Sequence, residues 1–373
     1  MANAASTYTG KQLFKSKDEM MKKLVLATAI SINLLAFSSM AGSTVTTLDG
    51  FFNKGGVVVT SDNYPTLETA RQMVKNQGLV GVNNLLHKRV LTPTDNQPVV
   101  RMNRDTYYSM AVVDVSKGAY ITMPKLPKGK YMSVEGITED HRIQPMKYGS
   151  GTFNLTTHTG KHLYLVIRLD ATFTLEEAKK YQDQMSITAK SATEFKSMAV
   201  DKTSFYETEH ALKAKAPALL ASSPLEATFG MFTDPTDSSK ELFTKEKYAM
   251  GAALGWGGAQ LVDNLYELSR NYPADQCHQM TFEDPKNKAF WSVTVYDKKG
   301  FMFGELANQS SNTAKPNKDG TYTVSFGCGD DAINNIPTKN ATGVFNLAMR
   351  HYIPSDKVRI DGYRLIPFVK AVK

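Results

Sequence analysis

Short runs of apolar and β-branched residues dominate two stretches of the chain, and a more helical stretch lies between them. From residue 43 to residue 170 these runs are separated by Gly, Pro and Asp, and the same pattern returns after residue 267. Such runs are typical of β-strands, and their close spacing favours a sandwich or barrel. We therefore expect a mainly β protein with two β domains, the second a sandwich of jelly-roll type. In the first stretch the expected strands are 56–62, 97–103, 106–115, 119–124, 130–137 and 162–169.

Helical spacing of apolar residues interrupts this pattern in two places. Residues 65–90 begin with a proline and are expected to form a helix that Gly78 and Gly81 break into two parts. Thr174 and Glu177 have the spacing of a capping box, which marks the start of a second helical stretch. The sequence thus divides into a leader with a signal peptide (1–41), an N-terminal β domain (42–172), a helical bridge (173–266) and a C-terminal β domain (267–373).

The leader has the features of a secretory signal. Two lysines precede a mostly apolar run from Leu24 to Phe37, and small residues lead up to Ala41, as a signal peptidase requires. The run is shorter than the ~20 residues of a membrane span, although an uncleaved anchor is the alternative. We expect translation to start at Met20 or Met21, and cleavage after Ala41 to release a periplasmic or secreted protein without a stable membrane span.

Cys277 and Cys328 are the only cysteines of the chain. An oxidising compartment permits a disulfide between them, and two buried free thiols are the alternative. The sequence alone leaves both open because it gives no Cα–Cα distance.

Charge and missing motifs exclude several classes of function. Cleavage after Ala41 removes five Lys and two acidic residues, so the formal net charge falls from +8 to +5, which is mild over about 330 residues. No Lys/Arg stripe is present, so we expect no nucleic-acid partner. The chain has no Gly-x-Ser-x-Gly elbow, P-loop, His-Glu-x-x-His or Rossmann glycine fingerprint. His158 and His162 stand four apart in HTGKH, which is more typical of a hairpin turn than of a metal pair. We predict neither a cofactor nor a metal site.

The most unusual stretch is RMNRDTYYSM, residues 101–110, which resembles a strand but contains an unbroken polar run. In a strand, Asn103, Asp105 and Tyr107 would share one face. A second polar cluster, Glu139-Asp140-His141, follows the expected strand 130–137.

If the two polar clusters converge, their carboxylates and imidazole could carry out acid–base chemistry. A buried polar network that holds two strands together is the structural alternative. We expect the first cluster, including Arg104, to form one network with Glu139, Asp140 and His141.

In FWSVTVYD, residues 290–297, Trp291, Val293 and Val295 share one strand face. This arrangement is typical of a core face with a turn at Asp297. The alternative is that Trp291 or Tyr296 lines a ligand cleft, where aromatic rings stack on sugars or apolar ligands.

Several of these segments resemble a known family. The segments VRMNRDTYYSMAVVDVS and KYMSVEGITEDHR are similar to the Asn-Arg-Asp-Thr strand and the acidic Asp-His segment of the domain of unknown function 1254. The segments KAFWSVTVYDKKGFMF, NQSSNT and DGTYTVSFG are similar to the domain of unknown function 1214, which typically follows it. The resemblance implies an immunoglobulin-like β domain, a small helical portion and a jelly-roll-like β domain, but no established general activity. Arg142 departs from the family pattern, in which an aromatic residue often stands.

Two functions remain open on the sequence. The first is a hydrolase-like enzyme that acts on a small molecule or an envelope polymer. The second is a non-catalytic protein, which could be a homo-oligomer, that binds a glycan, a lipid or a partner. The catalytic candidates are Asp105, Glu139, Asp140 and His141. The ligand-binding candidates are Asn103, Arg104 (an anion anchor), Tyr107, Trp291 and Tyr296.

Overall fold

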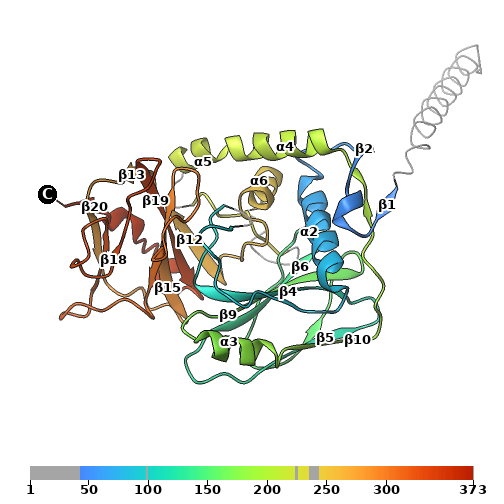
Figure 1. Cartoon of the computed structure of the whole chain (residues 1–373), viewed down its shortest axis with the longest axis horizontal. Coiled ribbons are helices and arrows are strands. Elements are labelled where there is room, and N and C mark those ends of the chain that lie inside the picture. Colours follow the sequence, from blue (N-terminus) through green and yellow to red (C-terminus); the bar gives the residue numbers. More distant parts are fainter. Residues whose placement is uncertain (1–42, 98–99, 223–225, 235–242, 373) are drawn as a thin grey trace, which may run out of the picture. The chain divides into compact units, whose positions relative to one another are not determined.

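The structure is a computed structural model that describes residues 43–97, 100–222, 226–234 and 243–372. The expected signal segment and its cleavage point lie outside these residues. Within the described ranges no helix is long and apolar enough to cross a membrane. Strands make up most of the regular elements, which confirms the prediction of a mainly β fold (Figure 1).

The N-terminal region contains two larger antiparallel sheets. The five-stranded sheet has the order β3 (Leu86–His87), β4 (Thr106–Asp114), β9 (His162–Asp170), β6 (Met132–Thr138) and β7 (Lys147–Tyr148). The three-stranded sheet has the order β10 (Ser186–Ala189), β5 (Ala119–Met123) and β8 (Gly151–Leu155). A core of apolar residues from both sheets and from helix α3 (Leu175–Gln182) lies between them. The predicted capping box of α3, made by Thr174 and Glu177, is confirmed.

Helices cover the other face of the five-stranded sheet (Figure 1). They are α2 (Tyr64–Val80), α4 (Lys202–Ala214), α5 (Ala216–Ser222) and α6 (Lys245–Gly255). Helix α2 ends at Gly81, but Gly78 does not break it and the next element is strand β3, so the expected second helical part is wrong. The remaining N-terminal elements are β1 (Thr44–Val45), η1 (Leu48–Gly50), β2 (Phe52–Val57) and β11 (Ser197–Met198). Strand β1 pairs with β11.

The C-terminal region has two more sheets with a core between them. The first consists of β12 (Asn264–Leu268), β19 (Val344–Tyr352), β15 (Phe290–Asp297) and β16 (Asn308–Ser310), and β13 (Tyr272–Pro273) also pairs with β19. The second consists of β18 (Asn335–Ile336), β17 (Tyr322–Phe326), β14 (His278–Phe282) and β20 (Lys370–Ala371). Two short helical turns complete the region, α7 (Asp356–Arg359) and η3 (Ile366–Phe368).

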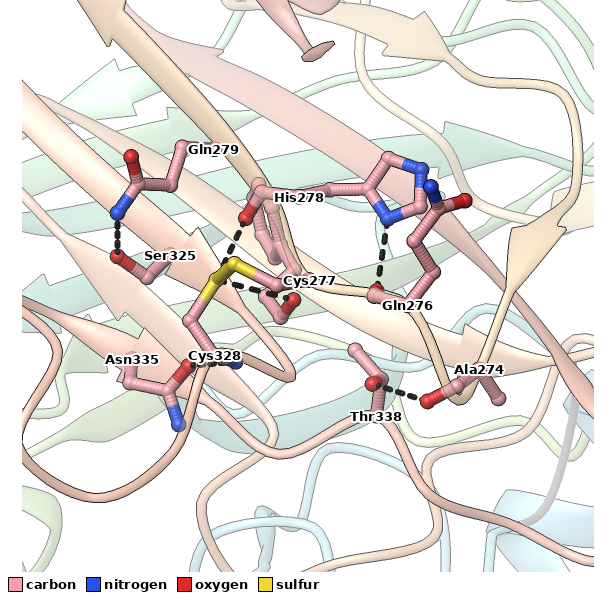
Figure 2. The surroundings of a disulfide bond; sticks show 10 residues. Ala274, Gln276, Cys277, His278, Gln279, Ser325, Cys328, Asn335 and Thr338 are labelled. Carbon is pink, nitrogen blue, oxygen red and sulfur yellow. Dashed lines mark hydrogen bonds between the residues drawn. A yellow bond between two sulfur atoms is a disulfide. The ribbon is translucent and has the colours of Figure 1, made fainter. Parts of the chain in front are cut away.

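Cys277 and Cys328 form a disulfide, which decides the question that the sequence left open. Their Cα atoms are 4.5 Å apart, and the bond joins the start of β14 to the loop after β17. Figure 2 shows Asn335 beside this bond, where its Oδ1 accepts the Cys328 backbone N–H at 3.0 Å. Because it closes a loop of about 50 residues, the bond could contribute roughly 4 kcal/mol in the chain-entropy model.

The polar run 101–105 is not part of a strand, which corrects the expected strand 97–103 for the residues described. Strand β4 begins only at Thr106. Arg101 has a φ of +57°, a left-handed conformation that no strand residue adopts. The Asn103 side chain then accepts the Asp105 backbone N–H at 3.1 Å, which forms a local turn. The strand alternation expected for Asn103 and Asp105 therefore does not apply.

Candidate functional site

A cavity lies over the helix-covered face of the five-stranded sheet. Side chains alternate along β4 and β9, so Tyr108 and Met110 face the helices while Tyr107 faces the opposite core. The cavity has a volume of about 930 Å³ and is also lined by α2, α5, the end of α6 and the strands β12 and β19. Because the N-terminal and the C-terminal regions both contribute to its wall, we call it the junction cavity.

One wall of the junction cavity is a polar row that crosses the sheet. Tyr108 and Arg168 are cross-strand partners in β4 and β9, and the Lys88 backbone N–H donates to the Tyr108 carbonyl at 2.8 Å. Directly opposed residues in a sheet have Cβ atoms only about 5 Å apart. Lys88, Tyr108 and Arg168 therefore present an ammonium, a phenol and a guanidinium side by side.

Arg168 is buried, and its guanidinium forms an ion pair with Glu135, which is not part of the cavity lining. Its Nη1 donates to Glu135 Oε2 at 2.6 Å, and its Nη2 lies 3.4 Å from the Gly257 carbonyl oxygen. A guanidinium has five N–H groups, so three remain after these two contacts. Burial raises the pKa of Glu135 above its usual value, although Arg168 acts in the opposite direction.

The facing wall comes from the C-terminal sheet, where Arg350 in β19 is also buried. Its guanidinium donates to the Thr294 hydroxyl at 2.9 Å, to the Tyr296 phenol oxygen at 2.8 Å and to the Arg101 carbonyl at 2.9 Å. These acceptors are neutral, and two N–H groups remain. Burial lowers the pKa of the neighbouring Arg101, and the charge of Arg350 acts in the same direction.

The charge of the cavity wall is one-sided. Among the described residues ten Lys and Arg side chains line the cavity, and no Asp or Glu does. The acids that pair with four of these cations are Glu68, Asp183, Glu135 and Glu209, which are not part of the lining. The ten cations are Arg71, Lys75, Lys88, Arg89, Arg101, Arg168, Lys213, Lys298, Lys299 and Arg350.

The positive charges near the cavity affect one another. Burial, together with the nearby Arg71 and Lys88, lowers the pKa of Lys75. Lys75, Lys88, Lys298 and Lys299 are exposed, whereas Arg168 and Arg350 are buried. Exposed lysines therefore surround a cavity whose inner wall carries arginines, an arrangement that attracts anions from solution.

The predicted catalytic residue Asp105 lies outside the junction cavity in a closed cluster. Its Oδ2 accepts the Ser292 hydroxyl at 2.6 Å and the Tyr352 phenol at 2.9 Å, and its Oδ1 accepts the Asn308 amide at 2.8 Å. Ser292, Asn308 and Tyr352 belong to the C-terminal sheet. Asp105 thus joins the two regions, and only 4% of it is exposed.

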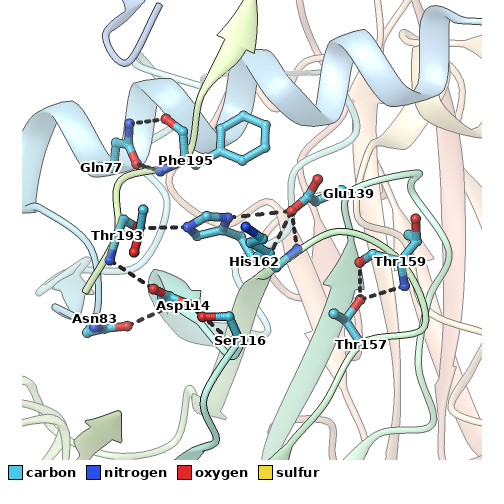
Figure 3. A network of polar contacts seen from close by, with 11 residues as sticks. Gln77, Asn83, Asp114, Ser116, Glu139, Thr157, Thr159, His162, Thr193 and Phe195 are labelled. Carbon is cyan, nitrogen blue, oxygen red and sulfur yellow. Dashed lines mark hydrogen bonds and ion pairs between the residues drawn. The ribbon is translucent and has the colours of Figure 1, made fainter. Parts of the chain in front are cut away.

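Glu139 lies in a different network, which Figure 3 shows. Its Oε1 accepts the backbone N–H groups of Lys161 and His162 at 2.8 and 2.9 Å, and lies 3.5 Å from His162 Nδ1. His162 Nε2 donates to the Thr193 carbonyl at 2.7 Å, because a carbonyl can only accept. Burial lowers the pKa of His162, but Glu139 and the Thr193 carbonyl outweigh it and raise the pKa above the usual value.

Asp140 and His141 have separate partners. Asp140 accepts the Thr138 hydroxyl at 2.5 Å and lies 3.1 Å from His158 Nε2. His141 Nε2 accepts the Gly257 backbone N–H at 3.2 Å, and burial lowers the pKa of this imidazole to about 3. In the described part of the chain, Asp105 and His141 have no hydrogen-bond partner in common. The expected single network is therefore not formed there.

The ligand-binding candidates also divide. Asn103 lines the junction cavity and donates to the Tyr108 phenol oxygen at 2.8 Å. Arg104 donates to the Thr92 carbonyl at 3.2 Å and is not part of the lining. Tyr107 and Trp291 are buried in the cores of the two regions, as the core interpretation of Trp291 predicted. Tyr296 is buried and donates to the Met102 carbonyl at 2.6 Å, a contact between the two regions.

Arg168 and Arg350 were not among the sequence-based candidates. Each is an arginine that follows a run of apolar residues within a strand, HLYLVIRLD and VFNLAMRHY. A charge at such a position must be paired or must face a polar space, and this is the signal that could have identified them. Within the described ranges no three His, Cys, Asp or Glu residues are placed to hold a metal ion.

The fold and the cavity define a mainly β chain with two β regions and a cationic cavity between them. Residues 82–195 match a family model described as "Protein of unknown function (DUF1254)", and residues 268–356 match one described as "Protein of unknown function (DUF1214)". The chain therefore belongs to the family in which these domains are paired, in the order that the resemblance implied.

The solved structures that resemble the chain include the following two. The VPA0106 protein of Vibrio parahaemolyticus has a TM-score of 0.61 and 16% identity, with 84% of this chain and 98% of that chain covered. An uncharacterized protein from Burkholderia cenocepacia has a TM-score of 0.52 and 14% identity, with 84% and 87% covered. At these identities the similarity shows the fold alone. No match to the chain was found among curated proteins.

Proposed function

We propose that this protein is an exported binding protein for a small organic anion, which occupies the junction cavity. One observation carries the proposal: two buried arginines, Arg168 and Arg350, line a cavity of about 930 Å³ to which no described Asp or Glu contributes. A carboxylate or phosphate group would pair with Arg350, whose described hydrogen-bond acceptors are neutral, and with the N–H groups that Glu135 leaves free on Arg168. Charge-assisted hydrogen bonds to such a group are roughly twice as strong as neutral ones.

The position of the acid–base candidates favours binding over catalysis. Neither Asp105, Glu139, Asp140 nor His141 lines the junction cavity. A general acid or base must come within hydrogen-bond reach of the reacting group, directly or through one water. Of the two functions that the sequence left open, the non-catalytic one is therefore the better supported.

The proposal also includes export of the protein and the fold types of its two β regions. Export is supported by the signal-like residues 21–41 and by the disulfide between Cys277 and Cys328, because disulfides persist in oxidising compartments. The immunoglobulin-like and jelly-roll-like types of the two β regions are supported by the pairs of facing sheets.

The test is binding of small anions by the purified mature protein, with benzoate, octanoate and octyl phosphate as probes and the uncharged benzamide and octanol as controls. We expect calorimetric binding of at least one anion and weaker binding of the matched uncharged compound. Arg350→Gln should weaken binding on the order of 10–100-fold, because it removes charge-assisted hydrogen bonds. The matched control is Arg270→Gln, an exposed arginine outside the junction cavity. Equal binding of anions and uncharged compounds would refute the proposal.

A further inference from the structure

We infer that the ligand of the junction cavity is an amphipathic anion, whose charged head lies at Arg168 and Arg350 and whose apolar body extends over the sheet toward Trp256. This inference rests on the proposed function and specifies its ligand class.

The first support is the order of side chains on the sheet. Next to the polar row of Lys88, Tyr108 and Arg168 lies an apolar row, because Met110 pairs with Leu86 on one side and with Val166 on the other. All three of these apolar residues line the junction cavity. A ligand that contacts Arg168 with its head therefore meets hydrocarbon one row further along the strands.

Met110 shows that this apolar surface is accessible from the cavity. It lies in β4, between β3 and β9, on the face that helices cover, yet it is only partly buried. In the centre of a covered sheet, such exposure arises because the cavity lies between the strand and the helices. Apolar surface that is left open in this way gains about 25 cal/mol per Å² when a ligand covers it.

The opposite wall of this part of the cavity is apolar as well. It is formed by residues that precede α6 and by the end of that helix, namely Met231, Phe232, Leu254 and Trp256. The Trp256 indole N–H donates to the Thr69 hydroxyl at 2.9 Å, and its ring lies edge-on to Tyr164 at 4.9 Å. Trp256 is therefore held in place without a ligand, and an apolar body would enter a preformed space.

The turn after α6 connects the two ends of the site. Gly257 has a φ of +71°, which favours glycine, and its carbonyl oxygen lies beside Arg168 while its N–H donates to His141. One turn thus contacts the residue that would bind the head and follows directly on the tryptophan that would contact the body. The function of His141 in this arrangement is to position the cavity wall.

The length of the apolar region follows from strand geometry. Arg168 and Tyr164 both line the junction cavity on β9 and are four residues apart. At about 3.3 Å per residue their Cα atoms are separated by roughly 13 Å. A short acid such as acetate fills only the head end of this space, whereas a medium-length acyl chain or a pair of aromatic rings extends along it.

The experiment is calorimetric titration of the wild-type protein with acetate, butyrate, hexanoate, octanoate and dodecanoate, together with octyl phosphate and octanol. Affinity should rise roughly fourfold per methylene group and reach a plateau once the cavity is filled. Stronger binding of octanoate or of octyl phosphate identifies the head as carboxylate or phosphate, and either result supports the inference.

Two variants locate the apolar body. Met110→Gln, which is polar but uncharged, should largely remove the gain in affinity with chain length but retain butyrate binding, whereas Val58→Gln, at an exposed position outside the cavity, should change neither. If Met110→Gln does not fold, Met110→Phe fills the same space and should bring the plateau to a shorter chain. Anion binding that is independent of chain length would overturn this inference and leave the proposed function intact. Absence of any anion binding, or equal binding of octanol and octanoate, would overturn both.

Discussion

Two sets of buried charged groups lie where the N-terminal and C-terminal regions meet, and they differ in what surrounds them. Asp105 accepts hydrogen bonds from Ser292, Asn308 and Tyr352, and it lies outside the junction cavity. Arg168 and Arg350 are equally buried, but both have N–H groups left over and both line the cavity. Burial and charge are therefore not sufficient to identify a binding site. A closed cluster stabilises the fold, and a charge that faces an open volume is available for a ligand.

The largest expected effect comes from Arg168, which forms an ion pair with Glu135 and also lines the junction cavity. A pair of variants can distinguish its contribution to stability from its proposed contribution to ligand binding. Arg168→Met leaves Glu135, whose side chain has 0% exposure, buried without its partner. This should lower the free energy of unfolding by about 3–5 kcal/mol, as measured by urea denaturation at neutral pH. The double variant Glu135→Met/Arg168→Met should recover most of the loss, because an apolar pair of similar volume replaces the ion pair.

The double variant should nevertheless fail to bind the anions that we propose as ligands of the wild-type protein. A stable double variant with unchanged affinity would show that Arg168 serves the fold alone, and the contrast with Asp105 would disappear.

A second prediction concerns the closed cluster. Asp105→Asn replaces one acceptor by a donor group that must face Asn308 or the hydroxyls of Ser292 and Tyr352. We expect a loss of about 3 kcal/mol in stability, from the charged hydrogen bonds removed and the donor left unpaired. At 2–4 °C per kcal/mol this lowers Tm by about 6–12 °C in a thermal scan.

Asp62→Asn, at an exposed position, is the control for Asp105→Asn and should leave Tm unchanged. Retained Tm with lost anion binding in Asp105→Asn would instead assign Asp105 to the ligand site.

The Glu139–His162 network extends the comparison to pH. The raised pKa of His162 contributes stability that is complete below pH ~6.5 and is lost as the pH rises through the folded-state value. Backbone N–H groups and His162 lower the pKa of Glu139 against the effect of burial, so its contribution is present above pH ~4.5 and is lost on acidification.

Glu139→Gln should therefore cost about 1 kcal/mol near pH 5.5 and less near pH 8.5, as measured by denaturation at both values. Glu176→Gln, an exposed helix residue, serves as the control. An equal loss at both pH values would show that the carboxylate acts only as an acceptor of the two backbone N–H groups.

The smallest expected effect concerns the exposed lysines at the cavity. Lys298→Gln/Lys299→Gln should change stability by less than about 0.5 kcal/mol. It should slow anion association roughly two- to fivefold at low salt and hardly at all at high salt, because the field of surface charges is screened. Stopped-flow measurements can check this against Lys125→Gln/Lys128→Gln, two exposed lysines outside the cavity. Identical slowing in both pairs would show that net charge alone steers the anion.

Much of the fold could be predicted because it is encoded locally. Short runs of apolar and β-branched residues identified β4, β5, β6, β9 and β15, and the pair Thr174 and Glu177 marked the start of α3. The paired family domains follow from local segments in the same way. The run 101–105 was misjudged because its turn depends on the left-handed Arg101 and on the Asn103 side chain, which no alternation pattern reveals.

The site was harder to predict because it depends on partners far apart in the sequence. Asp105 and Ser292 are separated by 187 residues, so the sequence could not show that this carboxylate has a closed set of donors. For Arg168 and Arg350 the sequence showed a positive charge in a largely apolar strand. It could not show that both side chains line a cavity. Asn103 is the one predicted ligand-binding residue that the structure places in the wall of the junction cavity.

The long separations around Asp105 also bear on the order of events during synthesis. Tyr352 follows Asp105 by 247 residues, so at about 5–20 residues per second roughly 12–50 s pass between the synthesis of the two. Throughout that interval Asp105 lacks at least one of its three donors, and the apolar row around Met110 lacks the part of the cavity wall that β19 provides. A nascent chain that begins to fold on the ribosome must remain incomplete for this time. A chain exported before folding has every partner of Asp105 present from the start.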